Sequence, residues 1–250
     1  MSLRLISRAK GIASIAKGKL EITARLSYDG RADYRKLTKG NMQKYNIAII
    51  GSVGVGKSTL ATELSKRLSR PLVPENFGDN EYIENQSDET FSLQWRFLDI
   101  QAQSHAYLQE HAQNGIIDRT IYETYEVFTR YYKDKLTPEE RSALRIRYDM
   151  LKQVVRLPDL VLYLHAPAVV SWRRMITRGR EFEAKQYDLR YFEDLEFLYG
   201  GLAAKLEKIT TLYSIDTEAT EEQVLTAALQ KIRAYERRFK PLKKEKVNVN

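Results

Sequence analysis

The sequence predicts an α/β fold, in which a parallel β-sheet of about five strands carries helices on both faces. Short apolar runs of strand length recur along the chain, near residues 46–50, 72–74, 115–118, 160–164 and 211–215. Longer amphipathic segments separate these runs, so expected strands and helices alternate. Alternation of this kind places the strands in parallel and joins them by right-handed crossovers.

The first expected strand runs directly into a glycine-rich loop that matches the pattern G-x-x-x-x-G-K-[ST]. The loop consists of Gly51, Ser52, Val53, Gly54, Val55, Gly56, Lys57, Ser58 and Thr59. Its glycines allow a tight turn that aims backbone N–H groups at phosphate oxygens, and the helix that follows adds its positive end. We expect Lys57 to reach the outer phosphates and Ser58 to bind Mg2+. The alternative is a turn without a ligand, but strand, loop and helix together favour a nucleotide site of the P-loop NTPase type.

Helix boundaries are visible in the second half of the chain. Helices are expected over about residues 88–113, 137–156 and 188–208, and a last one begins at Thr220. Thr137 with Glu140, and Thr220 with Gln223, form the capping-box pattern that starts a helix. These helices are expected to pack on the sheet.

Ionisable residues follow two of the expected strands. Glu75 comes after the second strand, and Asp118 and Arg119 come after the third. Open α/β sheets bind their ligands at the carboxyl ends of the strands, so these side chains are candidates for a site. An aspartate near a phosphate loop suits a second Mg2+ ligand, and we expect Asp118 to act beside Ser58.

Three arginines, Arg174, Arg178 and Arg180, lie close to Gly179. The planar guanidinium binds phosphate oxygens in pairs and stays charged, so the segment is expected to form a flap that closes on phosphates. Closure of such a flap excludes water, which would otherwise compete as an acceptor. The alternative is a solvated basic turn.

Two glutamines, Gln94 and Gln101, lie two turns apart on the expected helix 88–113. Their amides are suited to hydrogen bonds with a nucleobase edge. Taken alone, the residues favour the alternative that they are ordinary glutamines on a helix surface, and both interpretations stay open at the level of sequence.

The formal net charge of +8 is concentrated at the two ends of the chain. Residues 1–43 hold ten Lys and Arg against three Asp and Glu, and residues 231–250 hold eight against two. We therefore expect a basic arm or mitochondrial targeting segment at 1–43, a catalytic domain at 44–238 and a basic tail at 239–250. The body between the ends is mildly acidic, which argues against a nucleic-acid-binding groove.

Composition excludes other classes of protein. The chain has no cysteine, so it has no disulfide or thiol chemistry, and no apolar stretch is long enough for a transmembrane helix. A mitochondrial location on the matrix side is favoured by the basic, serine-containing start of the chain, with the cytoplasm as the alternative.

The ordered set of motifs resembles the deoxynucleoside kinase family over about residues 45–215. The resemblance rests on the phosphate loop and on four further patterns in chain order: Val73-Pro74-Glu75, Phe91-x-x-Gln94, Asp118-Arg119 with Tyr122 and Phe128, and Arg174-x-x-x-Arg178-Gly179-Arg180-x-x-Glu183. Thr120 stands where the family has serine, which is a mild departure.

The resemblance implies ATP and Mg2+ as cofactors, a deoxynucleoside as the substrate, and a role for each matching residue. Glu75 would act as general base for the 5′-hydroxyl, and Arg119 would hold that hydroxyl. The remaining roles are Ser58 and Asp118 for Mg2+, Gln94 for the nucleobase, Glu183 for the 3′-hydroxyl, and Lys57, Arg174, Arg178 and Arg180 for the phosphates. Gln101 and Thr124 occupy positions that tune base preference in the family and differ from many relatives, so the preferred base stays open.

Two alternative functions remain at this level. A thymidylate kinase would share the phosphate loop, but an arginine would be expected where Glu75 stands, because its substrate already carries a phosphate. A kinase-fold accessory subunit of a mitochondrial assembly, such as respiratory complex I, would suit the basic arm. The enzyme is expected to be a homodimer, or to join a larger assembly through the arm.

Overall fold

The computed structural model describes residues 44–75, 78, 80–83, 89–111 and 114–238, all of which belong to the second of two units of the chain, Met42–Asn250. The expected basic arm at 1–43 and the basic tail at 239–250 lie outside the described residues. Their proposed roles therefore stay predictions. No described helix combines the length and apolar character that crossing a membrane requires.

The described residues contain a five-stranded parallel sheet, as the sequence predicts. Its strands are β1 (Ile47–Gly51), β2 (Leu72–Val73), β3 (Ile116–Asp118), β4 (Leu160–His165) and β5 (Thr211–Asp216), in the order β2-β3-β1-β4-β5. In the register of the sheet, Ile49 pairs with Asp118 and Gly51 pairs with Leu164. The end of β3 therefore lies beside the strand that enters the phosphate loop.

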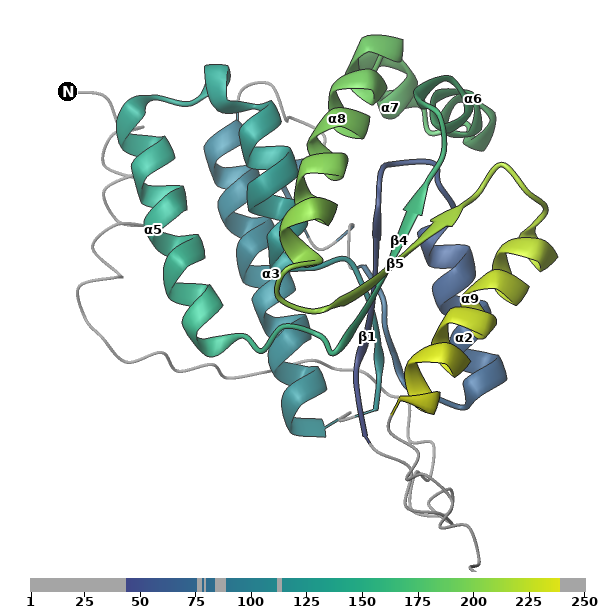
Figure 1. Cartoon of the computed structure of the whole chain (residues 1–250). Helices are drawn as coiled ribbons and strands as arrows, with labels where there is room; N and C mark the ends of the chain where they lie inside the picture. The colour runs from purple at the N-terminus through teal and green to yellow at the C-terminus, as the bar shows by residue number, and fades with distance from the viewer. Residues whose placement is uncertain (1–43, 76–77, 79, 84–88, 112–113, 239–250) are drawn as a thin grey trace, which may run out of the picture. The chain divides into compact units, whose positions relative to one another are not determined.

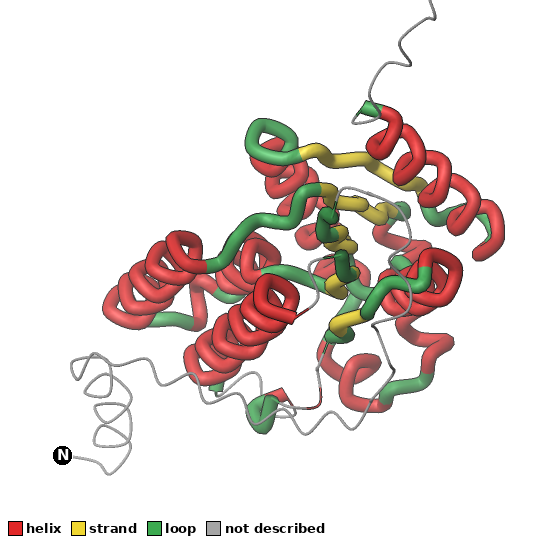
Figure 2. Tube along the Cα trace, turned by 90° about the horizontal axis from the view of Figure 1, so that it is seen from below, coloured by secondary structure: helices red, strands yellow, loops and turns green. Residues whose placement is uncertain are grey.

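Helices cover both faces of this sheet (Figures 1 and 2). The helical elements are α2 (Lys57–Leu68), α3 (Thr90–His111), α4 (Ile121–Glu123), η4 (Thr124–Thr129), η5 (Lys133–Lys135), α5 (Pro138–Val154), α6 (Ala168–Arg178), α7 (Glu181–Gln186), α8 (Leu189–Leu206) and α9 (Glu221–Arg237). In Figure 1, α2 and α9 lie together on one side of the strands, and α3, α5 and α8 lie on the other. The expected helices are confirmed, with ends shifted by a residue or two, as is usual for fraying ends.

Alternation along β1 divides the core in two. Ala48 and Ile50 are buried in the cluster that includes side chains of α3, α5 and α8, whereas Ile47 and Ile49 are buried with side chains of α2 and α9. Because successive side chains of a strand point to opposite faces, a central strand covered on both faces is apolar throughout. This is why the strand appears in the sequence as a continuous apolar run.

Capping boxes start two of the helices where the sequence predicts them. Glu140 N–H donates to Thr137 Oγ1 and begins α5 with Pro138 in its first turn, and Gln223 N–H donates to Thr220 Oγ1 at the start of α9. The short elements α4, η5 and α7 were not expected, nor was the π-helical turn η4. Its wider turn is stabilised by a 2.9 Å hydrogen bond from Thr129 Oγ1 to the carbonyl of Thr124, a contact that simple periodicity does not anticipate.

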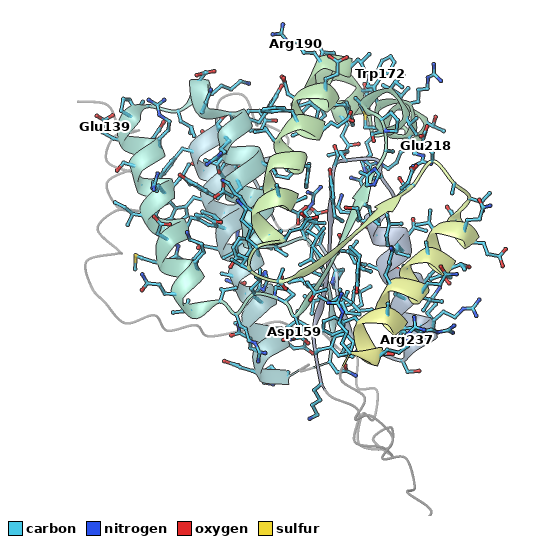
Figure 3. All side chains as sticks on the ribbon, in the orientation of Figure 1. Glu139, Asp159, Trp172, Arg190, Glu218 and Arg237 are labelled. Carbon is cyan, nitrogen blue, oxygen red and sulfur yellow. The ribbon has the colours of Figure 1, made fainter. Side chains whose placement is uncertain are left out.

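The two edges of the sheet carry different residues. Figure 3 labels Trp172 on α6 and Glu218 after β5 near the carboxyl edge, and Asp159, which precedes β4, near the opposite edge. The phosphate loop, Glu75 and Arg119 all come after strands, at the carboxyl edge. Parallel topology thus gathers the predicted functional residues at one end of the sheet.

Candidate active site

The phosphate loop joins β1 to α2. Gly54 and Gly56 have φ values of 80° and 89°, in the left-handed region that glycine adopts without strain. A Cβ at Gly54 would lie 2.4 Å from the backbone oxygen of Ser171, whereas a Cβ at Gly56 would meet no atom within 4 Å. The loop is therefore packed tightly on one side and open at the N-terminus of α2, where backbone N–H groups and the helix dipole favour an anion.

Lys57 begins α2 and is buried, with its Nζ donating a 2.8 Å hydrogen bond to the carbonyl of Ser52. Burial, and after it the charge of Arg119, lower the pKa of Lys57 to about 8, while the nearby carboxylates oppose this shift. Among the described residues the ammonium of Lys57 has one hydrogen-bond acceptor, the carbonyl of Ser52, whereas an ammonium carries three donors. This arrangement fits a lysine that binds phosphate oxygens.

Ser58 and Asp118 form the candidate metal site. Ser58 Oγ donates a 2.6 Å hydrogen bond to Asp118 Oδ2, and Asp118 Oδ1 is buried without a hydrogen-bond partner among the described residues. Burial raises the pKa of this carboxyl, while the charge of Lys57 opposes the rise. A hydroxyl next to an incompletely satisfied carboxylate fits Mg2+, which is commonly held by one or two protein oxygens together with phosphates. The structure thus brings together the two predicted metal ligands.

Arg119 connects two carboxylates, those of Glu75 and Glu123. Its Nε forms an ion pair with Glu75, and its NH1 lies 3.3 Å from Glu123 Oε1 and donates a 2.8 Å hydrogen bond to Tyr199 Oη. The guanidinium also lies over the ring of Phe128, 4.9 Å from its centroid. Burial alone would lower the pKa of Arg119, but the facing acidic groups outweigh it and raise the pKa well above its ordinary value.

The residues predicted to bind the substrate line one cavity next to Arg119. Gln94, Gln101 and Thr124 are buried and line it together with Glu75 and Glu183. Its wall further includes Val53, Ile83, Leu93, Phe97, Arg119, Phe128, Tyr132, Tyr187 and Tyr191. The two glutamines are thus buried at a cavity whose wall includes five aromatic rings, and the alternative that they lie on a helix surface is wrong. Aromatic walls with a few polar groups are typical of small-molecule sites.

A second cavity lies on the other side of the phosphate loop. It is lined by Gly54, Val55, Gly56, Thr59, Leu60, Glu63, Arg174, Thr217, Ala219, Glu221, Val224 and Leu225. Arg174 is fixed in its wall, because NH2 donates a 2.6 Å hydrogen bond to the carbonyl of Thr217 and NH1 a 3.2 Å hydrogen bond to its hydroxyl. The loop therefore separates two cavities, which suits a donor on one side and an acceptor on the other.

The structure separates the three predicted flap arginines. Arg178 and Arg180 lie on either side of Gly179 and contact Glu183 at 2.5 Å and 3.2 Å, whereas Arg174 lies in the second cavity. Glu183 is 3% exposed, and its two carboxylate oxygens are paired with the two guanidinium groups. The contact links the flap to the cavity that holds Gln94.

Two site residues were missed by the sequence analysis, Glu123 and Tyr199. Glu123 is completely buried and accepts a 2.8 Å hydrogen bond from the hydroxyl of Tyr199. One signal was present, since Thr120 and Glu123 form a capping-box pattern directly after Asp118 and Arg119. Nothing local pointed to Tyr199, which lies on α8.

The fold and the site together define a P-loop phosphotransferase, with a phosphate loop, a hydroxyl and a carboxylate that suit a metal ion, and a second carboxylate beside a cavity. Comparison with known proteins narrows this class. The family model described as deoxynucleoside kinase matches residues 47–235. The chain therefore belongs to the deoxynucleoside kinase family.

Individual relatives agree with this assignment. The chain is 32% identical over 171 residues to the deoxyadenosine kinase of Dictyostelium discoideum, which covers 64% of this chain and 69% of the relative. It is 27% identical over 201 residues to the deoxyguanosine kinase of Bacillus subtilis, which covers 76% of this chain and 94% of the relative. The structure of deoxyadenosine kinase from M. mycoides with bound dCTP superposes with a TM-score of 0.66 at 24% identity, covering 76% of this chain and 99% of that one, and shows the same fold.

These comparisons support phosphorylation of deoxynucleosides as the activity of the chain. They favour neither a thymidylate kinase nor an accessory subunit without enzymatic activity. The nucleobase differs among the relatives, since their names include both deoxyadenosine and deoxyguanosine.

Proposed function

We propose that the protein transfers the γ-phosphate of ATP to the 5′-hydroxyl of a deoxynucleoside with the help of Mg2+. The observation that carries this proposal is the arrangement of two cavities on opposite sides of one phosphate loop, with Glu75 and Arg119 in the cavity that also holds Gln94. ATP supplies the phosphoryl group when bound, and Mg2+ offsets part of its negative charge.

On the acceptor side, Glu75 accepts the proton of the 5′-hydroxyl, and Arg119 holds that hydroxyl in reach of the carboxylate. A carboxylate activates a hydroxyl acceptor by hydrogen bonding and proton removal. The same charge repels an acceptor that already carries a phosphate, which is a further reason to favour a nucleoside over a nucleotide. In this proposal Glu183 accepts a hydrogen bond from the 3′-hydroxyl.

On the donor side, Lys57 and the N-terminus of α2 bind phosphate oxygens, and Ser58 and Asp118 hold the metal. Arg174 contacts the nucleotide from the wall of the second cavity. Arg178 and Arg180 leave Glu183 in part to neutralise the charge of the transferring group, since phosphoryl transfer depends mainly on alignment and charge neutralisation.

The nucleobase contacts Gln94, Gln101 and Thr124, which are all uncharged and buried. Two carboxamides and one hydroxyl provide both donors and acceptors, so the complementary edge must offer both as well. We propose that this uncharged floor accepts more than one base.

We also propose a homodimer or a larger assembly, and a mitochondrial location with the cytoplasm as the alternative. Exposed apolar side chains support self-association: Phe197 on α8 is 82% exposed, and Ile146, Met150 and Val154 are spaced along one face of α5. Sedimentation of the full chain tests the first proposal. Import of the full chain into isolated mitochondria tests the second.

The function is tested by phosphate transfer from Mg-ATP to each of the four natural deoxynucleosides and to thymidine monophosphate, with the full-length protein. We expect turnover of one or two deoxynucleosides and none of the monophosphate. Turnover of the monophosphate alone would establish the thymidylate kinase instead. If a folded, nucleotide-binding protein turns over none of them, the accessory function replaces the enzyme.

A further inference from the structure

Glu123, the last residue of α4, presents its two carboxylate oxygens to different partners. Oε2 accepts a 2.9 Å hydrogen bond from the N–H of Thr120, the contact that a capping box requires. Oε1 accepts hydrogen bonds from the hydroxyl of Tyr199 at 2.8 Å, from Arg119 NH1 at 3.3 Å and from the N–H of Gly51 at 3.4 Å. One side chain thus touches both the start of the phosphate loop and the arginine of the acceptor cavity.

Helix capping does not explain the charge of Glu123. Capping boxes use glutamine as readily as glutamate, and in this chain Gln223 completes the same motif with Thr220. Glu123 is completely buried, and burial raises its pKa to about 7 against the opposing charges of Arg119 and Lys57. A buried carboxylate costs free energy unless it is paired. The charge of Glu123 is therefore explained by its charged partner at Oε1, Arg119.

Arg119 adopts a backbone conformation that other contacts must stabilise. Its backbone φ is 72°, a left-handed conformation that costs free energy in a residue with a Cβ. Its N–H donates a 3.1 Å hydrogen bond to the carbonyl of Ile49, and its guanidinium is fixed at Nε by Glu75 and at NH1 by Glu123 and Tyr199. Contacts on both sides of the guanidinium determine where it meets the cavity.

We infer that Glu123 is a positioning residue that couples the two sides of the site, because one carboxylate oxygen holds Arg119 against Glu75 and also accepts the amide of Gly51. The inference rests on the proposed function only in assigning the phosphate loop to the donor and Arg119 to the acceptor. A ligand that fixes the phosphate loop then also favours the bound position of Arg119, and a ligand that fixes Arg119 favours the bound position of the loop. Such coupling is reciprocal and appears as a ratio of dissociation constants.

The variant Glu123→Gln keeps the size of the side chain and the acceptor for Thr120, but removes the charge that holds Arg119. We would measure the dissociation constant of a non-hydrolysable ATP analogue with and without a saturating deoxynucleoside. In the wild type we expect the nucleoside to tighten binding about fivefold or more, and in the variant this ratio should fall to nearly one. Glu126→Gln is the matched control, because Glu126 lies on the neighbouring element η4 and pairs with Lys205 and Arg130 at the surface.

Crystal structures of the ligand-free wild type and Glu123→Gln give a readout that needs neither ligand nor turnover. We expect Arg119 to leave the left-handed conformation or to separate from Glu75 in the variant, and to stay in place in Glu126→Gln. A merely structural role would lower the melting temperature and leave the binding ratio and the position of Arg119 unchanged. That result, or a wild type without coupling, would overturn the inference.

Tyr199→Phe provides a second variant in case Glu123→Gln does not fold. It removes only the hydroxyl that contacts Arg119 and Glu123. We expect the binding ratio to fall part of the way toward one, and an unchanged ratio would count against the inference. A wild type that binds both ligands but transfers no phosphate would refute the proposed function, while these measurements would still decide the role of Glu123.

Discussion

Ser58 Oγ donates a 2.6 Å hydrogen bond to Asp118 Oδ2, which joins the first turn of α2 to the end of β3. The hydroxyl and the carboxylate come within reach of each other because β1 and β3 are parallel neighbours with Ile49 opposite Asp118. The position of the proposed metal site therefore depends on the sheet register as much as on the phosphate loop.

Asp118→Asn tests this site. The amide keeps the size of the side chain and loses the charge that attracts Mg2+, so we expect the Mg2+ concentration for half-maximal activity to rise about 10- to 100-fold. Titration of activity with MgCl2 at fixed ATP measures it. Asp149→Asn on the surface of α5 is the control, and equal Mg2+ dependence of the two variants would remove Asp118 from the metal site.

Glu75→Gln tests the general base. The amide cannot accept the proton of the acceptor hydroxyl, so we expect kcat to fall about 10²- to 10⁴-fold. The dissociation constant of ATP should stay nearly unchanged, because Glu75 lines the acceptor cavity and not the second one. Steady-state kinetics and isothermal titration measure the two quantities. Turnover close to that of the wild type would exclude Glu75 as the base.

Gly54→Ala and Gly56→Ala form a matched pair in the phosphate loop. Both glycines have positive φ, so each variant loses about 1 kcal/mol of stability for that reason. Only at Gly54 would the new Cβ overlap another atom, the backbone oxygen of Ser171 at 2.4 Å. We therefore expect Gly54→Ala to be less stable than Gly56→Ala by a further amount of about 1–3 kcal/mol, as for other overpacked sites.

Urea unfolding of the ligand-free variants measures this difference. Both are compared with the wild type at the same pH and ionic strength. Equal losses in the two variants would show that backbone conformation alone determines the glycines of this loop.

His105 gives the stability of the protein a dependence on pH. It is buried in α3, and burial lowers its pKa to about 4, with a backbone hydrogen bond to Arg156 acting in the opposite direction. The folded state disfavours the charged ring, so the contribution of His105 is unaffected above the unfolded pKa of about 6.5 and becomes unfavourable as the pH falls toward 4. Integrated over that window, the loss is about 3 kcal/mol.

His105→Gln removes this titration. We expect the variant to be less stable than the wild type at pH 7, because its packing is altered, and to lose less stability between pH 7 and pH 4. Free energies of unfolding in urea at the two pH values give the comparison. A difference between the two proteins that does not change with pH would contradict the lowered pKa.

Parts of the site that depend on neighbouring residues could be predicted from the sequence. The loop from Gly51 to Thr59 is encoded by fixed spacing, and the helix after it is local. The capping boxes at Thr137 and Thr220 were predicted for the same reason. Glu75 and Asp118 were located because residues at the ends of buried strands in a parallel sheet meet at one edge.

Parts that depend on packing between distant segments could not be predicted. The residues alone favoured a helix surface for Gln94 and Gln101, whereas in the structure both are buried and line the cavity next to Arg119. The hydrogen bond between Glu123 and Tyr199 joins α4 to α8, which are 76 residues apart in the chain. The π-helical turn at Thr124 was missed because its hydrogen bonding differs from the regular period.

The sequence by itself determined the alternation of strands and helices along the chain, the phosphate loop and the charged residues that come after the strands. Each of these depends on local spacing and on the alternation of apolar and polar residues. Only the tertiary structure decided that Arg174 lies apart from Arg178 and Arg180, and that Arg119 is held between Glu75 and Glu123. The physical reason is that hydrogen bonds and ion pairs between distant segments form wherever packing brings the groups within reach, and no periodicity in the chain records that distance.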